Sequence, residues 1–455
     1  MHLLDLIKNT FLQPRPSNPE DLAPEEIMHI NFKVVVVEFA DNVEGNCGEL
    51  VTAFLQSCEG LSVSYFNEPF NKTFLNFESR TLFDLVDKGQ DILEKTGADV
   101  LVWGYRENDK IRLNFQTSAQ YGTEINSVVS LLDCLYFPAA LFEQSGIVFP
   151  SSLVTLLYGA IVSALNFSNK SAQIQKRYLL KKIVDRLSAD NSAKALSIEY
   201  LPYVMTFLGI IYMSSCSHIE SEKDFKIVKG LLETALKHQD LINSPIHLGC
   251  IYNHLGQLYD HASTGALKRL SSYYRNAISN YRLAQKYWGK YNYPYDYGLI
   301  SYRLSELYYN YWKQKEELQA LRDSVFQLRE SERIFTYALF PEFWADIEGR
   351  LGYLLSVLSS LTASDEIAEL AIAAYKNRQK IITEKRDPLL WAQIQEKIGE
   401  IYYRIGKNES DKDALEESLE YYHDALYVFE NMSLREDSQR LTASIAKTNQ
   451  VLSYQ

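Results

Sequence analysis

Apolar residues near the end of the chain recur at the spacing of an amphipathic helix. Over residues 388–407 the apolar positions advance by alternate steps of three and four, and residues 412–430 show the same kind of spacing after a polar interval. Such spacing places the apolar side chains on one face of a helix. Two stripes in succession predict two consecutive helices that pack against each other. The stripes are Trp391, Ile394, Ile398, Ile401 and Ile405, then Leu415, Leu419, Tyr422, Leu426 and Phe429.

The same pair of stripes recurs along most of the chain. In the last copy, the positions used to align the repeats are Pro388, Trp391 and Gly399. Equivalent positions occur upstream at steps of 47 or 49 residues, and a degenerate first copy begins at Pro150. A fixed period between 20 and 50 residues is typical of stacked repeats. We therefore predict six helical hairpins over residues 150–430. Residues 431–455 should form a capping helix, because a solenoid must cover its last repeat. The upstream positions are Pro341, Trp344 and Gly352; Pro294, Tyr297 and Ser305; Pro245, Leu248 and Gly256; and Ile198, Leu201 and Gly209.

The second helix of each predicted hairpin carries a small residue, usually followed four positions later by a large one. Ser418 precedes Tyr422, and Ala277 precedes Tyr281. Small residues let paired helices approach closely, while large ones fill the space one turn away. On the first helices, Gly256 and Gly399 are predicted to lie where two helices nearly touch.

The first third of the chain has the pattern of strands instead. Residues 32–39, 61–66, 98–105 and 111–116 are apolar or alternating runs rich in β-branched and aromatic residues. Helical spacing fills residues 47–60 and 81–97, and the five polar residues 106–110 predict a hairpin. This order predicts a small α/β domain over residues 32–120, with a parallel centre and an antiparallel edge. A proline-rich leader (1–31) precedes it and a connecting segment (121–149) follows. The fold class predicted for the whole chain is α+β: the α/β domain, then an all-α solenoid.

The repeats resemble the tetratricopeptide repeat, whose first helix carries Leu-Gly-x-x-Tyr. The sequences LGIIY (208–212) and LGQLY (255–259) match this signature, and IGEIY (398–402) nearly does. The period is about 13 residues longer than the usual 34. VVVVEFAD and GADVLVWGY…IRLNF loosely resemble the TolB amino-terminal domain, and more closely the domain that precedes helical repeats in a group of bacterial tetratricopeptide-repeat proteins. The resemblance implies the fold and a bacterial type of protein, and it carries over no catalytic role.

Composition restricts the kinds of binding partner and the cellular compartment that can be expected. The formal net charge is −12, so no general attraction to nucleic acid or anionic lipid is expected. Five scattered cysteines argue against a disulfide framework and for a reducing compartment, which predicts a cytoplasmic protein. Residues 146–167 have no charge and about the length of a membrane span, but they include Pro150 and several polar side chains. We expect a buried repeat helix there; peripheral contact with a membrane stays open.

Candidate chemistry is sparse. His247, Cys250, His254 and His261 share one helical face, and zinc selects such side chains, but His247 and His254 would stand about 10 Å apart along the axis. We expect a polar face lining the repeat groove rather than a metal site. No phosphate loop or nucleophile elbow occurs, so neither an enzyme nor a cofactor is predicted. Glu396 lies one turn from Glu400, a spacing that an exposed helix face explains better than paired catalytic carboxylates.

These observations favour a non-enzymatic scaffold that binds a protein or peptide segment along the concave face of the solenoid. The resemblance implies that first-helix residues beside the Leu-Gly signature face this groove. Because acids stand beside aromatic rings there, a basic or aromatic-rich partner segment is expected. The predicted groove residues are Asn253, Gln257, Tyr302, Glu306, Tyr309, Glu396, Glu400 and Tyr403.

A second hypothesis is a ligand sensor, in which the α/β domain binds a small molecule and signals through the solenoid. The ligand would lie beyond the carboxyl ends of the parallel strands, near Asp41, Asn42 and Glu44. A deep polar pocket there would favour the sensor, and a shallow surface would favour the scaffold.

Overall fold

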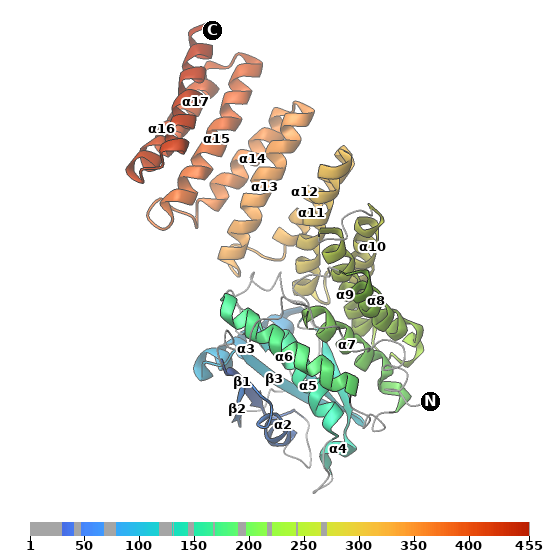
Figure 1. Ribbon diagram of the computed structural model, residues 1–455. Coiled ribbons are helices and arrows are strands. Elements are labelled where there is room, and N and C mark those ends of the chain that lie inside the picture. Colours follow the sequence, from blue (N-terminus) through green and yellow to red (C-terminus); the bar gives the residue numbers. More distant parts are fainter. Residues whose placement is uncertain are drawn as a thin grey trace. The chain divides into compact units, whose positions relative to one another are not determined.

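A computed structural model shows two compact units, Met1–Ile300 and Ser301–Gln455, each of which is described by itself (Figure 1). The leader expected over residues 1–31 lies almost wholly outside the described residues. Side chains of residues 79–86, 188, 189, 264 and 271 are likewise outside the description. The described residues are 30–40, 47–67, 79–117, 130, 132–143, 150–166, 169–189, 197–215, 221–242, 244–264 and 271–454.

The described part of the N-terminal unit contains a five-stranded sheet in the order β2-β1-β3-β4-β5. β1 (Phe32–Val37) pairs in parallel with β2 (Leu61–Phe66) and β3 (Val100–Glu107). β4 (Lys110–Thr117) pairs antiparallel with β3 and with β5 (Cys134–Pro138). The predicted strands, the parallel centre and the antiparallel edge are confirmed. At the β3–β4 turn Asn108 has a φ of 57°, a left-handed conformation that asparagine tolerates better than most residues.

β5 corrects the prediction of a connecting segment over residues 121–149. Its sequence, CLYFP, is a short apolar run, and its first four residues are buried against the sheet. A run this short has no periodicity that separates a strand from a piece of buried helix. The segment forms a strand because it pairs with β4. Without β5, the backbone N–H and C=O groups along the outer edge of β4 would have no strand partner.

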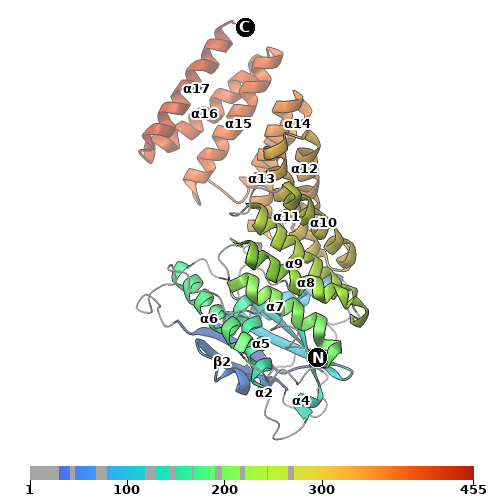
Figure 2. The same ribbon diagram turned by 45° about the vertical axis from the view of Figure 1, so that its right-hand side comes forward.

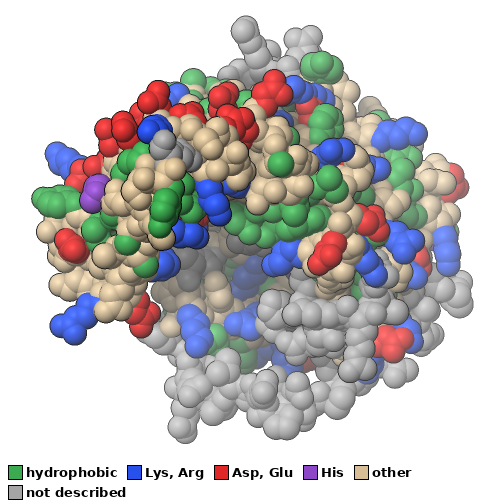
Figure 3. Space-filling model, turned by 90° about the horizontal axis from the view of Figure 1, so that it is seen from above, with side chains coloured by type: hydrophobic (Ala, Val, Ile, Leu, Met, Phe, Trp, Pro, Cys, Tyr) green, Lys and Arg blue, Asp and Glu red, His purple; other side chains and the backbone are tan. Residues whose placement is uncertain are grey.

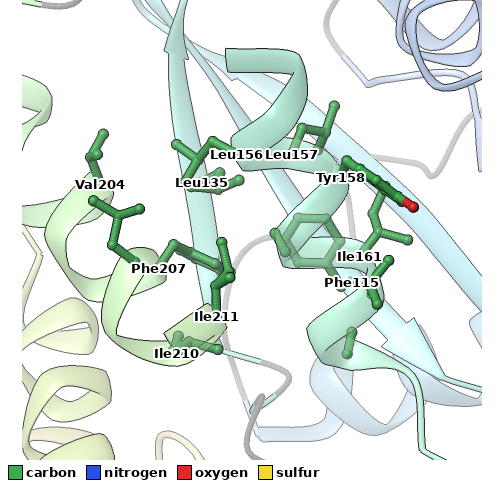
Figure 4. Packing of buried hydrophobic residues seen from close by; sticks show 14 of the residues in the cluster. Phe115, Leu135, Leu156, Leu157, Tyr158, Ile161, Val204, Phe207, Ile210 and Ile211 are labelled. Atoms are coloured by element: carbon green, nitrogen blue, oxygen red, sulfur yellow. The ribbon is translucent and has the colours of Figure 1, made fainter. Parts of the chain in front are cut away.

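Helices cover both faces of the sheet, because successive side chains of a strand point to opposite sides. Val34 and Val36 belong to the core shared with α2 (Cys47–Leu55) and with two repeat helices, α5 (Ser151–Ala164) and α7 (Leu201–Ser215). Val35 and Val37 belong to a second core, with Ile92 of α3 (Ser79–Thr96). Figure 4 shows the larger core, where rings and branched side chains of β4, β5, α5 and α7 point toward one another.

The first repeat helices therefore complete the core of the α/β domain. α5 (Ser151–Ala164) is 14 residues long and buries most of its side chains, as predicted for residues 146–167. None of the described helices is long and apolar enough to cross a membrane. The compact units divide at residue 300, within α11 (Pro294–Lys315), rather than at the domain boundary expected near residues 120–150. The physical reason is that the apolar sheet face needs α5 and α7 to cover it.

The described residues contain the six predicted helix pairs and the predicted terminal helix. Four first helices begin at one of the repeated prolines, which fits the first helical position because proline lacks the N–H that would have no partner there. Figure 2 shows α13/α14 and α15/α16 as neighbouring pairs. The pairs are α5 with α6 (Lys170–Ala189), α7 (Leu201–Ser215) with α8 (Glu222–Lys237), α9 (Pro245–Thr264) with α10 (Ser271–Trp288), α11 (Pro294–Lys315) with α12 (Leu318–Glu332), α13 (Pro341–Thr362) with α14 (Asp365–Arg378), and α15 (Pro388–Glu409) with α16 (Lys412–Asn431); α17 (Arg435–Tyr454) follows.

Aromatic rings of the second helices pack directly against glycines of the first helices. A Cβ atom on Gly256 would lie 2.5 Å from the Tyr281 ring, and one on Gly399 would lie 2.7 Å from the Tyr422 ring. The predicted close approach at both glycines is confirmed. The small residue Ser418 also contributes a hydrogen bond, because its hydroxyl donates to the Gly399 carbonyl at 2.9 Å.

α17 covers the last pair with an apolar stripe. Leu441 and Ile445 of this helix join a core with Tyr422 and Phe429 of α16. Polar residues such as Thr442 and Gln450 face outward. This division of faces fits the capping role predicted for residues 431–455.

Candidate partner-binding face

In the C-terminal unit, five contacts between helices α11 and α13 or α15 and α17 join residues that are 44 positions apart. Three consecutive contacts join α11 to α13, and two join α15 to α17. In these contacts the residue numbers on both helices rise together, so the two helices of each contact run in the same direction. Because the repeat period is about 47 residues, each contact lies about one helical turn before the equivalent position of the next repeat. We call the surface formed by these contacts the first-helix face. Its contacts are Tyr302–Asp346, Glu306–Arg350, Tyr309–Tyr353, Glu396–Arg440 and Tyr403–Lys447.

Tyr302 lies beneath this face rather than on it. Its ring is buried, its hydroxyl donates to Asp346 Oδ2 at 2.8 Å, and the Arg350 guanidinium lies 4.6 Å from the ring centroid. Burial, followed by the nearby Asp346 carboxylate, raises the pKa of the Tyr302 hydroxyl well above its usual range. Tyr302 therefore stabilises the contact between α11 and α13 and is not open to a partner.

The predicted groove acids are paired with basic side chains. Glu306 forms an ion pair with Arg350, and Glu400 forms one with Lys397 at 2.9 Å. Glu396 is buried, and its two oxygens accept from Nε and Nη2 of Arg440, both at 2.9 Å. The first-helix face thus carries charges of both signs, whereas the charged residues predicted to line the groove were all acids. Figure 3 likewise shows positive, negative and hydrophobic side chains interspersed on the surface it presents.

Replacing Glu396 with glutamine is expected to lower the free energy of unfolding by about 1 kcal/mol, because the variant loses a charge-assisted bidentate contact between α15 and α17. Glu400→Gln is the matched control. Its ion pair with Lys397 is half exposed, and the expected change is about 0.3 kcal/mol. Urea unfolding of both variants measures the difference. Equal values would show that the Glu396–Arg440 pair adds nothing to the packing of α17.

Asn253 and Gln257 are buried in the N-terminal unit, so the prediction that their side chains line an open groove is wrong. Gln257 Oε1 lies 3.1 Å from Nδ1 of His254, and Nε2 of His254 lies 2.9 Å from Oδ1 of Asp133. Asp133 immediately precedes β5. The polar face of α9 therefore joins the repeats to the sheet, a contact between distant segments that spacing within one helix could not reveal.

The histidine and cysteine cluster of α9 belongs to the same buried layer. Burial lowers the pKa of His247 to about 3, and its Nε2 lies 3.3 Å from the Thr206 hydroxyl. Burial raises the pKa of the Cys250 thiol well above its usual value. Within the described residues no group of three or more His, Cys, Asp or Glu side chains is placed to hold a metal ion. His247, Cys250 and His254 pack in the core instead of lining the groove expected from the sequence.

An aromatic cluster remains accessible on the first-helix face. The Tyr353 side chain is 45% exposed, and its hydroxyl lies 2.7 Å from that of Tyr309. The Tyr309 ring also lies 5.6 Å from Trp312, with the Lys313 ammonium 5.4 Å from its centroid. Burial and the Tyr353 hydroxyl raise the pKa of Tyr309, so the Tyr309 hydroxyl stays protonated at neutral pH. We call Tyr309, Trp312 and Tyr353 the aromatic cluster.

Sequence reasoning found Tyr309 and missed Trp312 and Tyr353. A signal for Tyr353 was present, since it stands 47 residues after Glu306 and 47 before Glu400, both of which were predicted to line the groove. Tyr403 is partly buried, and the Lys447 ammonium lies 5.3 Å from its ring. The residues of the second hypothesis, Asp41, Asn42 and Glu44, lie outside the described residues, so the sensor stays a prediction.

Comparisons with known proteins give little further guidance. No protein-family model matches the chain, and no curated protein matches it at the significance required. Among solved structures, the chain is similar to the crystal structure of BtubC (BKLC) from P. vanneervenii, with 18% sequence identity and a TM-score of 0.31. The match covers 49% of this chain and 81% of that chain. A similarity this low carries no argument about fold or function.

Proposed function

We propose that the protein is a non-enzymatic scaffold with tetratricopeptide-like repeats, and that it binds a partner segment on the first-helix face of α11 and α13. The observation that carries the proposal is the accessible aromatic cluster at the junction of these two helices. Aromatic side chains supply a large share of binding energy at protein interfaces, particularly where they are surrounded by polar groups that exclude water. Here the surrounding groups are Glu306, Arg350 and Lys313.

The chemistry of the cluster favours a segment that carries arginine, lysine or aromatic side chains. Tyrosine rings on and beneath this face already contact cations of the chain itself. The Arg350 guanidinium lies over the Tyr302 ring, and the Lys313 ammonium lies over the Tyr309 ring. The half-exposed Tyr353 offers the same kind of surface to a partner. Because the neighbouring acids are paired internally, we expect stacking and hydrogen bonds to contribute more than net charge.

A cytoplasmic location belongs to the same proposal. The four cysteines that the structure describes, Cys47, Cys58, Cys134 and Cys250, are buried thiols without disulfide bonds. Unbridged cysteines fit the reducing compartment expected from the sequence.

Tyr353→Ala combined with Trp312→Ala is expected to weaken partner binding at least tenfold, which corresponds to about 1.4 kcal/mol. Tyr427→Ala is the control, because Tyr427 is 63% exposed on the second helix α16. The native protein, the double variant and the Tyr427→Ala control are each used for affinity purification from native cells. This step identifies partners that the double variant loses and the control retains. Calorimetry with the purified partner then measures the dissociation constants. Equal affinities of the double variant and the native protein would place the binding surface elsewhere.

A further inference from the structure

One carboxyl group of the C-terminal unit is buried without the partners that a charge needs. Glu348 on α13 has no exposed surface, and neither of its oxygens has a hydrogen-bond partner. It faces Glu332 and Arg329 of α12 and Asn377 of α14. An ionised carboxylate is strongly disfavoured in such surroundings, because protein groups do not replace the water it has lost.

The neighbouring charges do not compensate Glu348. The Arg329 guanidinium already binds Glu332 at 2.8 Å, and Glu330, also on α12, is paired with Arg333. The Arg378 side chain of α14 lies where a Cβ on the adjacent Gly349 would be, and its buried Nε has no hydrogen-bond partner. Glu348 thus sits beside one carboxylate that repels its charge, and the nearby Arg329 guanidinium forms its ion pair with that carboxylate instead.

These surroundings determine when the group ionises. Burial, and after it the adjacent Glu332 carboxylate, raise the pKa of Glu348 to about 8 from the usual 4.5. Below the unfolded-state pKa, both the folded and the unfolded chain hold this proton, and the group does not affect stability. As pH rises from the unfolded-state pKa to the folded-state pKa, the unfolded chain releases the proton while the folded chain keeps it. Stability therefore falls through this window and levels off above it.

We propose that Glu348 is a pH-sensitive switch built into the packing of α12, α13 and α14, and that loss of its proton loosens this part of the C-terminal unit. Asp346, Arg350 and Tyr353 lie on the same helix as Glu348. A looser α13 would therefore also weaken the contacts with α11 on the first-helix face; this consequence alone rests on the proposed function.

The test is urea unfolding of the full chain between about pH 4.5 and 9, for the native protein, Glu348→Gln and Glu366→Gln. Glutamine has the shape of the protonated carboxyl and cannot ionise. Glu366 is an exposed acid of α14 and serves as control. The variant Glu348→Gln should be as stable as the native protein near pH 4.5. Above about pH 8 its equilibrium constant of unfolding should be at least tenfold smaller than that of the native protein. The control should follow the native curve. Parallel curves for the native protein and Glu348→Gln would overturn the proposal.

A second variant keeps the test decisive if Glu348→Gln folds poorly. Glu332→Gln removes the neighbouring negative charge and frees Arg329, and both changes favour ionisation of Glu348. The folded-state pKa of Glu348, which sets the upper limit of the pH window in which stability falls, should therefore move to lower pH. A window that stays in place would assign the pH dependence to another group and overturn the proposal. Neither measurement involves a binding partner, so failure here is distinct from failure of the scaffold function.

Discussion

Replacing Asp133 with alanine is expected to destabilise the N-terminal unit by about 3 kcal/mol or more. Asp133 and His254 are both almost fully buried, and the carboxylate oxygen Oδ1 lies 2.9 Å from Nε2 of the imidazole. The other oxygen, Oδ2, accepts from the backbone N–H of Ser130 at 2.7 Å. Removal of the carboxyl takes an acceptor from the buried His254 imidazole and from the partly buried Ser130 N–H at once, and water cannot reach the imidazole without opening the core.

The measurement is urea unfolding of the full chain, with Asp91→Ala as control. Asp91 is an exposed acid on α3 in the same unit, and its replacement should change stability by no more than about 0.5 kcal/mol. A double-mutant cycle with His254→Ala separates the direct contact from the loss of packing. A coupling energy near zero would mean that the pair does not hold α9 to the sheet, even if each single variant is unstable.

Replacing Gly399 with leucine is expected to cost about 3 kcal/mol, the second-largest effect. A Cβ atom on Gly399 would lie 2.7 Å from the Tyr422 ring and 3.3 Å from the Ser418 carbonyl oxygen. The ring is buried between α15 and α16 and cannot turn outward without leaving a cavity. On an exposed helix the same substitution would stabilise, because leucine favours the helix more than glycine does. The direction of the change therefore tests whether packing outweighs helix propensity.

Lys407→Leu provides the comparison, since Lys407 lies on the same helix and is exposed. Its effect should stay within about 0.5 kcal/mol. Denaturant midpoints of the two variants and the native chain give the result. A native-like or higher midpoint for Gly399→Leu would show that α15 and α16 can separate without loss, and would remove the packing role of the repeated glycine.

The repeats were predictable because their signal is local. A helix stripe, a proline at the first position and a small residue opposite a ring recur at about 47 residues, and each repeat mostly contacts its neighbours. The same locality made the close approach at Gly256 and Gly399 predictable. β5 gave no comparable signal, because it is too short for periodicity and owes its conformation to β4.

The candidate site was only partly predictable. Glu306 and Tyr309 take part in the first-helix face and stay partly exposed, whereas Asn253, Gln257 and Tyr302 are buried. The repeat period tells which positions are equivalent, but it does not tell which neighbour each side chain meets. That neighbour stands 44 residues away, because adjacent helices are offset by about a turn.

The sequence by itself determined the element types, their order, the repeat period and the positions of close helix contact, since these depend on patterns within a few turns of chain. Only the tertiary structure decided that α5 and α7 complete the core of the sheet, and that Asp133 meets His254 across 121 residues. It also decided that Arg440 neutralises Glu396 and that both oxygens of the buried Glu348 are left without a hydrogen-bond partner. Charge pairing and burial depend on distances between distant segments, and these distances follow from packing rather than from any local pattern.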